Sequence, residues 1–288
     1  MKIGLIDVDG HNFPNFALMK IANYHRQQGD TVEWVNHFEK YDKVYKSIVF
    51  TFTPDNTVSV QADETVKGGT GYKMYGELFC DDTEPDYSLY PQYPHAYGFL
   101  TRGCIRRCAW CVVPKKEGGI RAYRDIETVL QSRKTAILMD NNVLACEHGL
   151  RQLEKIIDTG CKVDFNQGLD SRLVTDEIAR ILSKIKWINY IRFACDTTPA
   201  VEPLIKAIEK LNKYDVKNYR IFVYLLVKDV SDACERCKIL KKLGVYPFAQ
   251  TYRDEENRLM PTAEQKRFAW YVNQKAVFKS TEWEQYRG

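Results

Sequence analysis

From residue 97 onward the sequence repeats one pattern, a short apolar segment followed by a longer amphipathic one, and this repetition constrains the fold more than any other feature. The six short segments are typical of buried strands: YGFLTRG, TAILMDN, KVDFNQG, YIRFACD, YRIFVYLLVK and YPFAQTY. The five segments between them are typical of helices, with Thr175 and Ser231 as predicted caps and Gly160 and Gly244 as predicted ends. The pattern predicts a parallel α/β fold, a partial (β/α)6 barrel of the TIM type, whose functional groups lie at the C-terminal ends of the strands.

The first 95 residues are organised differently. KIGLIDV, TVEWV and SIVFTFT are predicted strands and FALMKIANYHRQQG is a predicted helix, which together indicate a small open α/β sheet. Residues 54–95, with a glycine turn and a stretch rich in Pro and Tyr, are predicted to be irregular and to end in a linker. We therefore expect a small α/β domain with its linker over residues 1–95, the partial barrel over residues 96–253, and a C-terminal helical extension over residues 254–288, with one helix, AEQKRFAWYVNQKAVFK.

The composition is that of an ordinary globular protein, with 44% apolar and 28% charged residues in a chain of 288. The N-terminal sequence has no basic region followed by a long apolar run, and the longest apolar runs are far too short to cross a bilayer. Most of the nine cysteines are scattered singly, which favours a reducing compartment over a disulfide framework. We expect a cytoplasmic protein with no membrane contact.

Charge is divided unevenly along the chain. Residues 1–95 carry 8 Lys and Arg against 14 Asp and Glu, whereas residues 96–288 carry 34 against 24. The basic second part suits an anionic partner such as nucleic acid, and so do the aromatic and basic residues that alternate in the C-terminal segment. A pattern that only keeps the protein soluble explains the charges equally well, and the helical spacing of the aromatic residues favours packing against the barrel.

The tight cluster of cysteines lies in TRGCIRRCAWCVVP, directly after the first strand of the predicted barrel. Cys104, Cys108 and Cys111 follow the spacing C-x3-C-x2-C, without an evident fourth metal ligand. A structural zinc site needs four ligands, and an ordinary iron–sulfur cubane is held by four cysteines. A third interpretation is a [4Fe–4S] cluster on three thiolates, with one iron open to a small molecule. The candidates for a fourth ligand, none of which has a spacing that demands it, are His95, Cys146 and Cys195.

With Trp110 before its last cysteine, the motif C-x3-C-x-aromatic-C resembles the signature of the radical S-adenosylmethionine (radical SAM) superfamily, and the resemblance covers about residues 97–253. It implies that the three cysteines hold a [4Fe–4S] cluster whose fourth iron binds the amino and carboxylate groups of S-adenosylmethionine. It also implies that the reduced cluster cleaves S-adenosylmethionine to methionine and a 5′-deoxyadenosyl radical. The electron would come from a donor such as flavodoxin or ferredoxin.

The resemblance gives further residues candidate roles. At the end of the second strand, MDNN places Asp140, Asn141 and Asn142 near the methionine amino group, by position and polarity alone. Trp110 lies where relatives approach the adenine, Asp196 where they bind the ribose, and Tyr252 where they contact the adenine again. Gln167 and Arg172 follow the third strand together with Asn166 and Asp170, and Arg172 suits a carboxylate. Each of these polar residues has an alternative role as a helix cap or a solvated loop residue.

Two other motifs are weaker. Cys234 and Cys237 form a second C-x2-C, but they fall inside a helical pattern, so we interpret them as packing residues rather than as ligands of an auxiliary cluster. Residues 9–14 resemble the Asp-x-His-x-x-Gly loop of cobalamin-binding domains, with Pro14 in the place of the glycine. We therefore expect a degenerate domain of that kind, for which cobalamin is not a cofactor. The alternative is a turn in which Asp9 or Asn12 caps the next helix.

The order of the parts and the loop TRGCIRRCAWCVVPKKEGGIR are similar to the methylthiotransferases of this superfamily. Those enzymes use additional N-terminal cysteines for a second cluster, whereas Cys80 is the only cysteine before residue 96, which argues against sulfur insertion. We expect a radical SAM enzyme that transfers a methyl or methylthio group or modifies a C–H bond, on a substrate that the sequence does not identify. The alternative is a non-catalytic iron–sulfur or zinc module that binds nucleic acid and does not bind S-adenosylmethionine.

Overall fold

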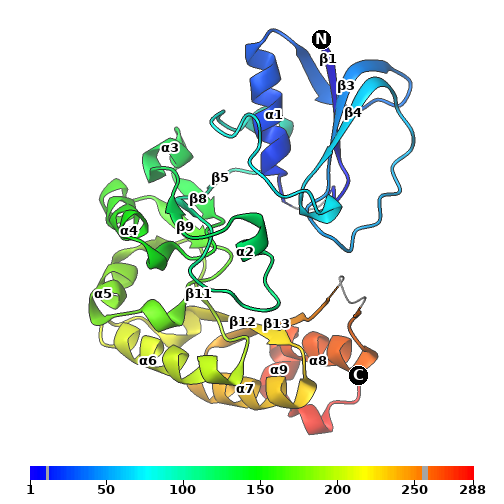
Figure 1. Ribbon diagram of the computed structural model, residues 1–288. Helices are drawn as coiled ribbons and strands as arrows, with labels where there is room; N and C mark the ends of the chain where they lie inside the picture. Colours follow the sequence, from blue (N-terminus) through cyan, green and yellow to red (C-terminus); the bar gives the residue numbers. More distant parts are fainter. Residues whose placement is uncertain (11–12, 255–258) are drawn as a thin grey trace. The chain divides into compact units, whose positions relative to one another are not determined.

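The computed structural model describes residues 1–10, 13–254 and 259–288, and the chain divides into two compact units (Figure 1). Unit 1 comprises Met1–Pro94 with Lys115–Glu117, and unit 2 comprises His95–Pro114 with Gly118–Gly288. Each unit has a hydrophobic core of its own. Parallel strands and amphipathic helices make up both, so the predicted α/β class is confirmed. No helix in the described part of the chain is long and apolar enough to span a membrane.

Unit 1 is a four-stranded parallel sheet with one long helix. The sheet order is β2 (Thr31–Trp34), β1 (Lys2–Asp7), β3 (Lys40–Ser47) and β4 (Gln61–Gly68). Helix α1 (Phe16–Gln27) packs Leu18 and Met19 against Ile3 and Leu5 of β1 to form the core. The 3-10 turns η1 (Thr70–Tyr72) and η2 (Tyr87–Leu89) lie in the segment that follows β4.

Two sequence predictions for unit 1 are wrong. The third strand is Lys40–Ser47 rather than SIVFTFT, because Tyr41, Val44 and Tyr45 point into the core while Phe50 and Phe52 lie in an exposed turn. Residues 54–95 are not wholly irregular, since they contain β4. This strand lies at the edge of the sheet and its side chains are mostly exposed and polar, so it lacks the apolar alternation by which strands are recognised.

The loop after β1 tests only part of the two sequence interpretations. His11, on which the cobalamin-type motif depends, and Asn12, one of the two predicted caps, lie outside the described residues. Helix α1 is capped by Asn15, whose Oδ1 accepts from the Leu18 N–H at 3.3 Å, and not by Asp9. The Asp9 carboxylate instead accepts from the backbone N–H groups of Val49 and Phe50, and so fixes the turn after β3.

Unit 2 contains the six predicted strands, in sequential order and parallel. They are β5 (Ala96–Gly98), β8 (Thr135–Leu138), β9 (Lys162–Phe165), β11 (Ile191–Ala194), β12 (Ile221–Val227) and β13 (Tyr246–Thr251). The first three form one sheet with the added strand β10 (Lys186–Trp187), and the last three form a second sheet. The first predicted strand, YGFLTRG, is divided, since Thr101–Arg102 leave the sheet as β6 and pair antiparallel with β7 (Arg121–Ala122).

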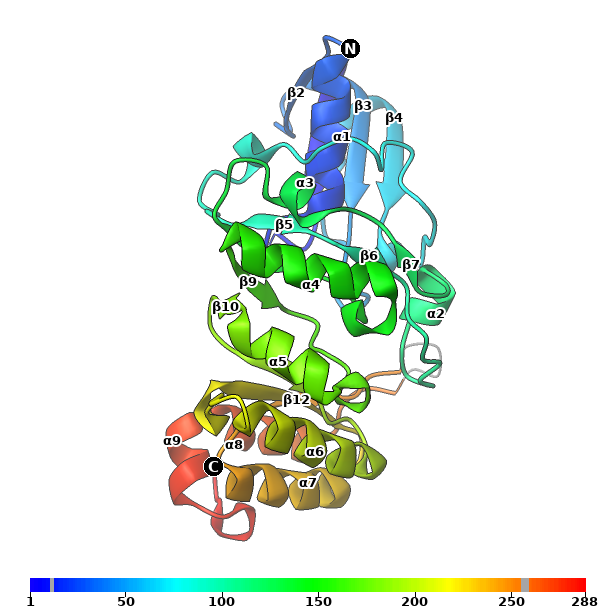
Figure 2. The ribbon, with the colours of Figure 1, turned by 90° about the vertical axis from the view of Figure 1, so that its left-hand side faces the viewer.

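The helices of unit 2 follow the strands in alternation, and α3 to α7 succeed one another along one side of the strands (Figure 2). Their bounds are α3 (Ile126–Leu130), α4 (Glu147–Thr159), α5 (Asp176–Lys184), α6 (Val201–Asn212), α7 (Val230–Leu243), α8 (Ala263–Asn273) and α9 (Lys275–Ser280). The short helix α2 (Val113–Lys116) has two residues in each unit. The cap at Thr175 and the left-handed glycine ends at Gly160 and Gly244 are confirmed. The predicted cap of α7 is wrong, because Asp229 and not Ser231 accepts the Asp232 N–H.

Between β9 and β11 the two sheets of unit 2 are joined mainly by side chains. One backbone bridge links Leu169 to Phe193. Beside it, Arg192 donates two hydrogen bonds, at 2.6 and 2.7 Å, to the carboxylate of Asp164, which is 3% exposed. The Tyr224 hydroxyl donates to the Asn166 carbonyl at 2.7 Å. A buried bidentate ion pair therefore takes the place of a continuous backbone ladder at this junction.

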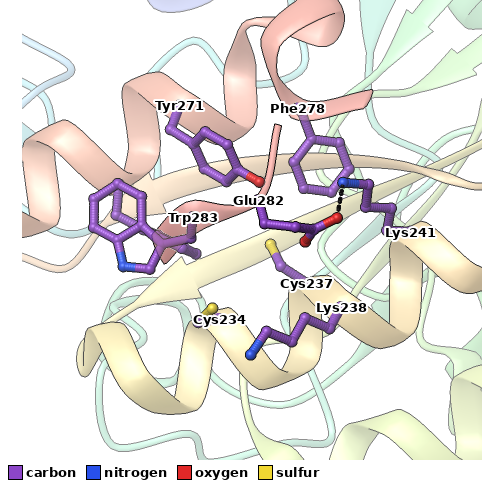
Figure 3. A pocket seen from close by; sticks show the side chains of 9 residues that line it. Cys234, Cys237, Lys238, Lys241, Tyr271, Phe278, Glu282 and Trp283 are labelled. Carbon is purple, nitrogen blue, oxygen red and sulfur yellow. Dashed lines mark hydrogen bonds and ion pairs between the residues drawn. The ribbon is translucent and has the colours of Figure 1, made fainter. Parts of the chain in front are cut away.

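The C-terminal segment forms two helices rather than the single predicted one, with a break at Gln274. Helix α8 begins with a capping box between Thr262 and Gln265 and packs against β13 and α7. Figure 3 shows that Cys234 and Cys237 of α7 face Tyr271 and Phe278 in a small pocket. Both cysteines are buried, and burial raises the pKa of each thiol, that of Cys237 to about 12, which agrees with their interpretation as packing residues.

Candidate active site

The loop between β6 and β7 carries Cys104, Cys108 and Cys111, directly beyond the C-terminal end of β5. Pairing of the two short strands closes the base of the loop, and the Cys104 N–H donates to the Gly118 carbonyl at 3.2 Å. Gly103 has a φ of +79°, and a Cβ at this position would collide with the backbone of Gly119. Only glycine fits here, so the sequence of the loop fixes how it leaves the sheet.

The three thiols lie near one another on the cysteine loop. Cys104 and Cys108 are half-buried and Cys111 is exposed, and all three are free thiols. Burial raises the pKa of Cys108, the charge of Arg172 lowers it, and Cys104, Asp196 and Asp170 raise it again, which places these groups around one point. Among the described residues no three His, Cys, Asp or Glu side chains are arranged to hold a metal ion.

A polar network surrounds the Cys104 side of the loop. The Asn142 Nδ2 group lies 3.5 Å from Cys104 Sγ and 3.3 Å from Asp170 Oδ2. Asp170, only 6% exposed, also accepts from Arg106 Nε at 2.9 Å and from the guanidinium of Arg172 at 2.6 and 3.0 Å. Burial raises the pKa of Asp170, but the hydrogen bonds from Arg172 and Arg106 outweigh it and hold the pKa below its usual range.

The Asn142 carbonyl oxygen is the clearest sign of a missing partner. Asn142 is 2% exposed, and within the described part of the chain its Oδ1 is the buried side-chain polar atom that has no hydrogen-bond partner. Because the Asp170 carboxylate only accepts hydrogen bonds, the amide must present its NH2 group to it, which leaves the oxygen as the unsatisfied atom. An unpaired buried acceptor is costly, so this position fits a bound molecule with a hydrogen-bond donor.

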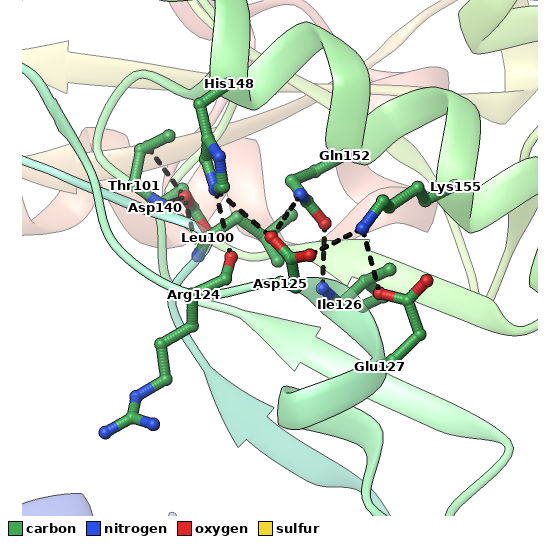
Figure 4. Close-up of polar contacts among 10 residues, drawn as sticks. All are labelled: Leu100, Thr101, Arg124, Asp125, Ile126, Glu127, Asp140, His148, Gln152 and Lys155. Carbon is green, nitrogen blue, oxygen red and sulfur yellow. Dashed lines mark hydrogen bonds and ion pairs between the residues drawn. The ribbon is translucent and has the colours of Figure 1, made fainter. Parts of the chain in front are cut away.

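Asp140, predicted to approach the methionine amino group, uses its carboxylate within the protein. Figure 4 shows it against Leu100 and Thr101, whose backbone N–H groups donate to it at 3.1 and 2.6 Å, with a further bond from the Thr101 hydroxyl at 2.7 Å. Burial raises the pKa of Asp140 to about 6, although these hydrogen bonds act in the opposite direction. The residue therefore ties the end of β8 to the start of the cysteine loop.

The other predicted residues occupy a range of environments at the same ends of the strands. Trp110 is 37% exposed on the cysteine loop, and Asn141 is half-buried beside Asn142. Gln167 is exposed, and its amide donates to Asn166 at 3.3 Å. Asp196 accepts from the Leu226 N–H at 3.2 Å, and burial raises its pKa. Tyr252 donates to Asp254 at 3.3 Å and lies under Lys228.

The three candidates for a fourth ligand differ in position and burial. His95 is at the opposite, N-terminal edge of the sheet, where its Nδ1 bonds the Thr135 hydroxyl at 2.7 Å. Cys195 is fully buried, with its pKa raised by burial to about 11, and Cys146 is half-buried at the start of α4. The roles of Arg106 and Asp170 as partners were not foreseen, because they are 64 residues apart and their pairing depends on the tertiary fold.

No protein-family model matches the chain. The amino-acid sequence nevertheless has relatives among the radical SAM enzymes, and the predicted resemblance to that superfamily is confirmed. The relatives are ribosomal protein uS12 methylthiotransferases RimO. That of Caldanaerobacter subterraneus is 27% identical over 168 residues, or 56% of this chain and 36% of the relative.

Two further relatives have the same name. The protein of Clostridioides difficile is 27% identical over 46% of this chain and 28% of its own length, and that of Citrifermentans bemidjiense is 26% identical over 49% and 32%. The chain thus spans about a third of the length of the curated relatives that it matches. The similarity supports an enzyme of the radical SAM type, with a [4Fe–4S] cluster and S-adenosylmethionine as cofactors.

Proposed function

We propose that this chain is a radical SAM enzyme in which Cys104, Cys108 and Cys111 hold a [4Fe–4S] cluster with one iron open to S-adenosylmethionine. The observation that carries the proposal is the unpaired, buried Asn142 Oδ1 beside the cysteine loop, which a bound donor would satisfy. The three thiols supply the donor chemistry that an iron–sulfur cluster needs. The parallel strands β5, β8, β9, β11, β12 and β13 would form the partial (β/α)6 barrel that carries the site.

The chain's own residues bind and orient the cofactors. The cluster and S-adenosylmethionine supply the radical chemistry when bound. Asn142 Oδ1 would accept a hydrogen bond from the ammonium group of S-adenosylmethionine, and Asn141 would lie beside it. Trp110 and Tyr252 would flank the adenine, and Asp196 would accept from the ribose. Asp140 holds the loop in place through Leu100 and Thr101. Arg172, 43% exposed at its pair with Asp170, stands where a cofactor or substrate carboxylate would meet it, with Gln167 nearby in sequence.

The assignment of domains along the chain belongs to the same proposal. Residues 1–95 would form a degenerate cobalamin-binding-like domain with its linker, residues 96–253 the radical SAM barrel, and residues 254–288 the helical extension. Cys80, the only cysteine before residue 96, is 4% exposed, and burial raises its pKa to about 11. A lone buried thiol does not supply a second cluster. Radical modification without sulfur insertion is therefore the reaction class that the N-terminal unit favours. The reaction would take place in the cytoplasm, with a flavodoxin or ferredoxin as electron donor.

The substrate class remains a separate part of the proposal. The relatives are named for a protein substrate, ribosomal protein uS12, so the names give no support to the nucleic acid expected from the basic charge. In the C-terminal segment Phe268, Tyr271 and Phe278 are buried, which removes them as base-stacking surfaces. A polypeptide is accordingly the first substrate class to test, with 5′-deoxyadenosine release as the readout.

The proposal is tested by electron paramagnetic resonance on the full chain, reconstituted with iron and sulfide without oxygen and then reduced. We expect a cubane signal that changes when S-adenosylmethionine is added. Cys108→Ala should lose the cluster, whereas Cys146→Ala should keep both the signal and its response, since only three thiols are ligands. A signal that ignores S-adenosylmethionine, or one lost in Cys146→Ala, would mean a fourth protein ligand. Zinc in place of iron would favour the non-catalytic alternative.

A further inference from the structure

The strongest unexplained arrangement is the way Asn142 is held. It follows β8, whereas Asp170 follows β9 and Arg106 lies on the cysteine loop, so three separate segments meet at one amide. Its NH2 group is shared between a thiol, Cys104 Sγ at 3.5 Å, and a carboxylate, Asp170 Oδ2 at 3.3 Å. The Arg106 backbone N–H points at the same sulfur, at 3.3 Å. The Cys104 sulfur thus receives two hydrogen bonds from the chain itself.

Asp170 has the properties of a residue that fixes this amide. Its side chain is 6% exposed, and its carboxylate accepts hydrogen bonds from Arg106, Arg172 and Asn142, which together fix its orientation. The two guanidinium groups neutralise its charge, because each donates directly to a carboxylate oxygen. The backbone N–H of Arg172 also donates to Oδ1 of this carboxylate, at 3.2 Å. Asn142 therefore has little freedom to turn its N–H groups away from the sulfur.

We propose that Asn142 is a positioning residue that donates a hydrogen bond to the Cys104 thiolate of the cluster, and that Asp170 holds it in that orientation. This inference rests on the proposed function. Hydrogen bonds to cluster sulfurs stabilise the reduced, more negative state and so raise the reduction potential. A bond to a charged group is worth about 1.5 kcal/mol or more, which is about tenfold in the reduction equilibrium, or about 59 mV for one electron.

The test is a redox titration of the cluster without S-adenosylmethionine, followed by electron paramagnetic resonance. Asn142→Leu removes both polar atoms at similar volume, and we expect its midpoint potential to become more negative by about 59 mV. Asn273→Leu is the matched control, since Asn273 is also partly buried but bonds only the backbone of Ala249, far along the chain at β13. Its potential should equal that of the unaltered protein. If Asn142→Leu loads no cluster, Asn142→Ser removes the same N–H group and is measured in its place.

The role of Asp170 is isolated by a double-mutant cycle. Asp170→Asn alone removes a negative charge and also loosens Asn142, whereas in the Asn142→Leu background only the charge effect is left. If the changes in midpoint potential of the two single variants do not sum to that of the double variant, Asp170 acts by positioning Asn142. If they do sum, Asp170 acts only through its charge. An Asn142 variant that keeps its cluster and its potential overturns the inference but leaves the radical SAM proposal standing. An unaltered protein that takes up no iron–sulfur cluster overturns both.

Discussion

Asp140 shows how a single side chain connects the sheet to the cysteine loop. The carboxylate lies at the end of β8, is 1% exposed, and accepts from the backbone of Leu100 and Thr101, the residues that lead into the cysteine loop. A buried carboxylate is penalised when it is charged, and here the penalty exceeds the gain from three donors, so its pKa rises to about 6. The loop is therefore positioned by a group whose charge changes near neutral pH.

This shift predicts a pH dependence of stability. Asp140 keeps a proton to a higher pH in the folded chain, with a pKa of about 6, than in the unfolded chain, where 3.8 applies. Its contribution is fully present below pH 3.8 and is lost as the pH rises through about 6. Relative to Asp140→Asn, the unaltered protein should lose about 1–3 kcal/mol of unfolding free energy between pH 4 and pH 7. Urea unfolding at several pH values measures this difference, and a difference that is constant with pH would contradict it.

At the scale of elements, a buried ion pair between Arg192 and Asp164 helps to join β9 to β11. Arg192→Met would leave the Asp164 carboxylate charged, 3% exposed and without its bidentate partner, so we expect a loss of about 3–5 kcal/mol. Replacing both residues by apolar ones should recover much of the loss. The control is Lys206→Met, which breaks an exposed pair with Glu202 and should cost under about 0.5 kcal/mol. Denaturant unfolding distinguishes the variants, and equal costs for Arg192→Met and Lys206→Met would show that the junction is held by other contacts.

The start of α7 gives a second prediction at this scale. Asp229→Ala removes the side chain that accepts the Asp232 N–H at 2.8 Å, and should cost about 1 kcal/mol of unfolding free energy. Ser231, which the sequence favours as the cap, is already the second residue of the helix. Ser231→Ala should therefore be nearly neutral. The two alanine variants serve as controls for each other in thermal unfolding. A larger cost at Ser231 than at Asp229 would reverse the assignment of the cap.

These elements also show what the sequence could predict. The order of the six strands, the cap at Thr175 and the end at Gly160 were predictable because each depends on neighbouring residues. Strand β4 was missed because an exposed edge strand has no apolar alternation. The cysteine loop was found because its three cysteines lie within eight residues. The pairing of Arg106 with Asp170 was not found, since only the fold brings residues 64 positions apart into contact.

At the scale of the whole molecule, the chain has two separate hydrophobic cores. One is built around Ile3 and Leu5 of β1, and the other includes Val223 and Leu225 of β12. All three cysteines of the loop belong to the unit that contains the second core. A ligand that binds only the folded form of one unit stabilises that unit by mass action. Cluster binding should therefore act on one core and not on the other, provided that the two cores unfold independently.

Hydrogen exchange tests this directly. After anaerobic reconstitution we expect the slowest amides of β12 to exchange about 100-fold more slowly, equivalent to about 2.7 kcal/mol, while those of β1 are unchanged. Removal of the cluster with an iron chelator should reverse the effect, and Cys108→Ala should not show it. The expectation follows from the loop's internal bonding, which a bound cluster would supplement. This bonding includes a two-residue strand pair and backbone bonds from Cys104 to Gly118 and from Cys111 to Cys108. Equal slowing in both strands would mean that the chain unfolds as one cooperative unit, and no slowing in β12 would mean that the loop binds the cluster without stabilising unit 2.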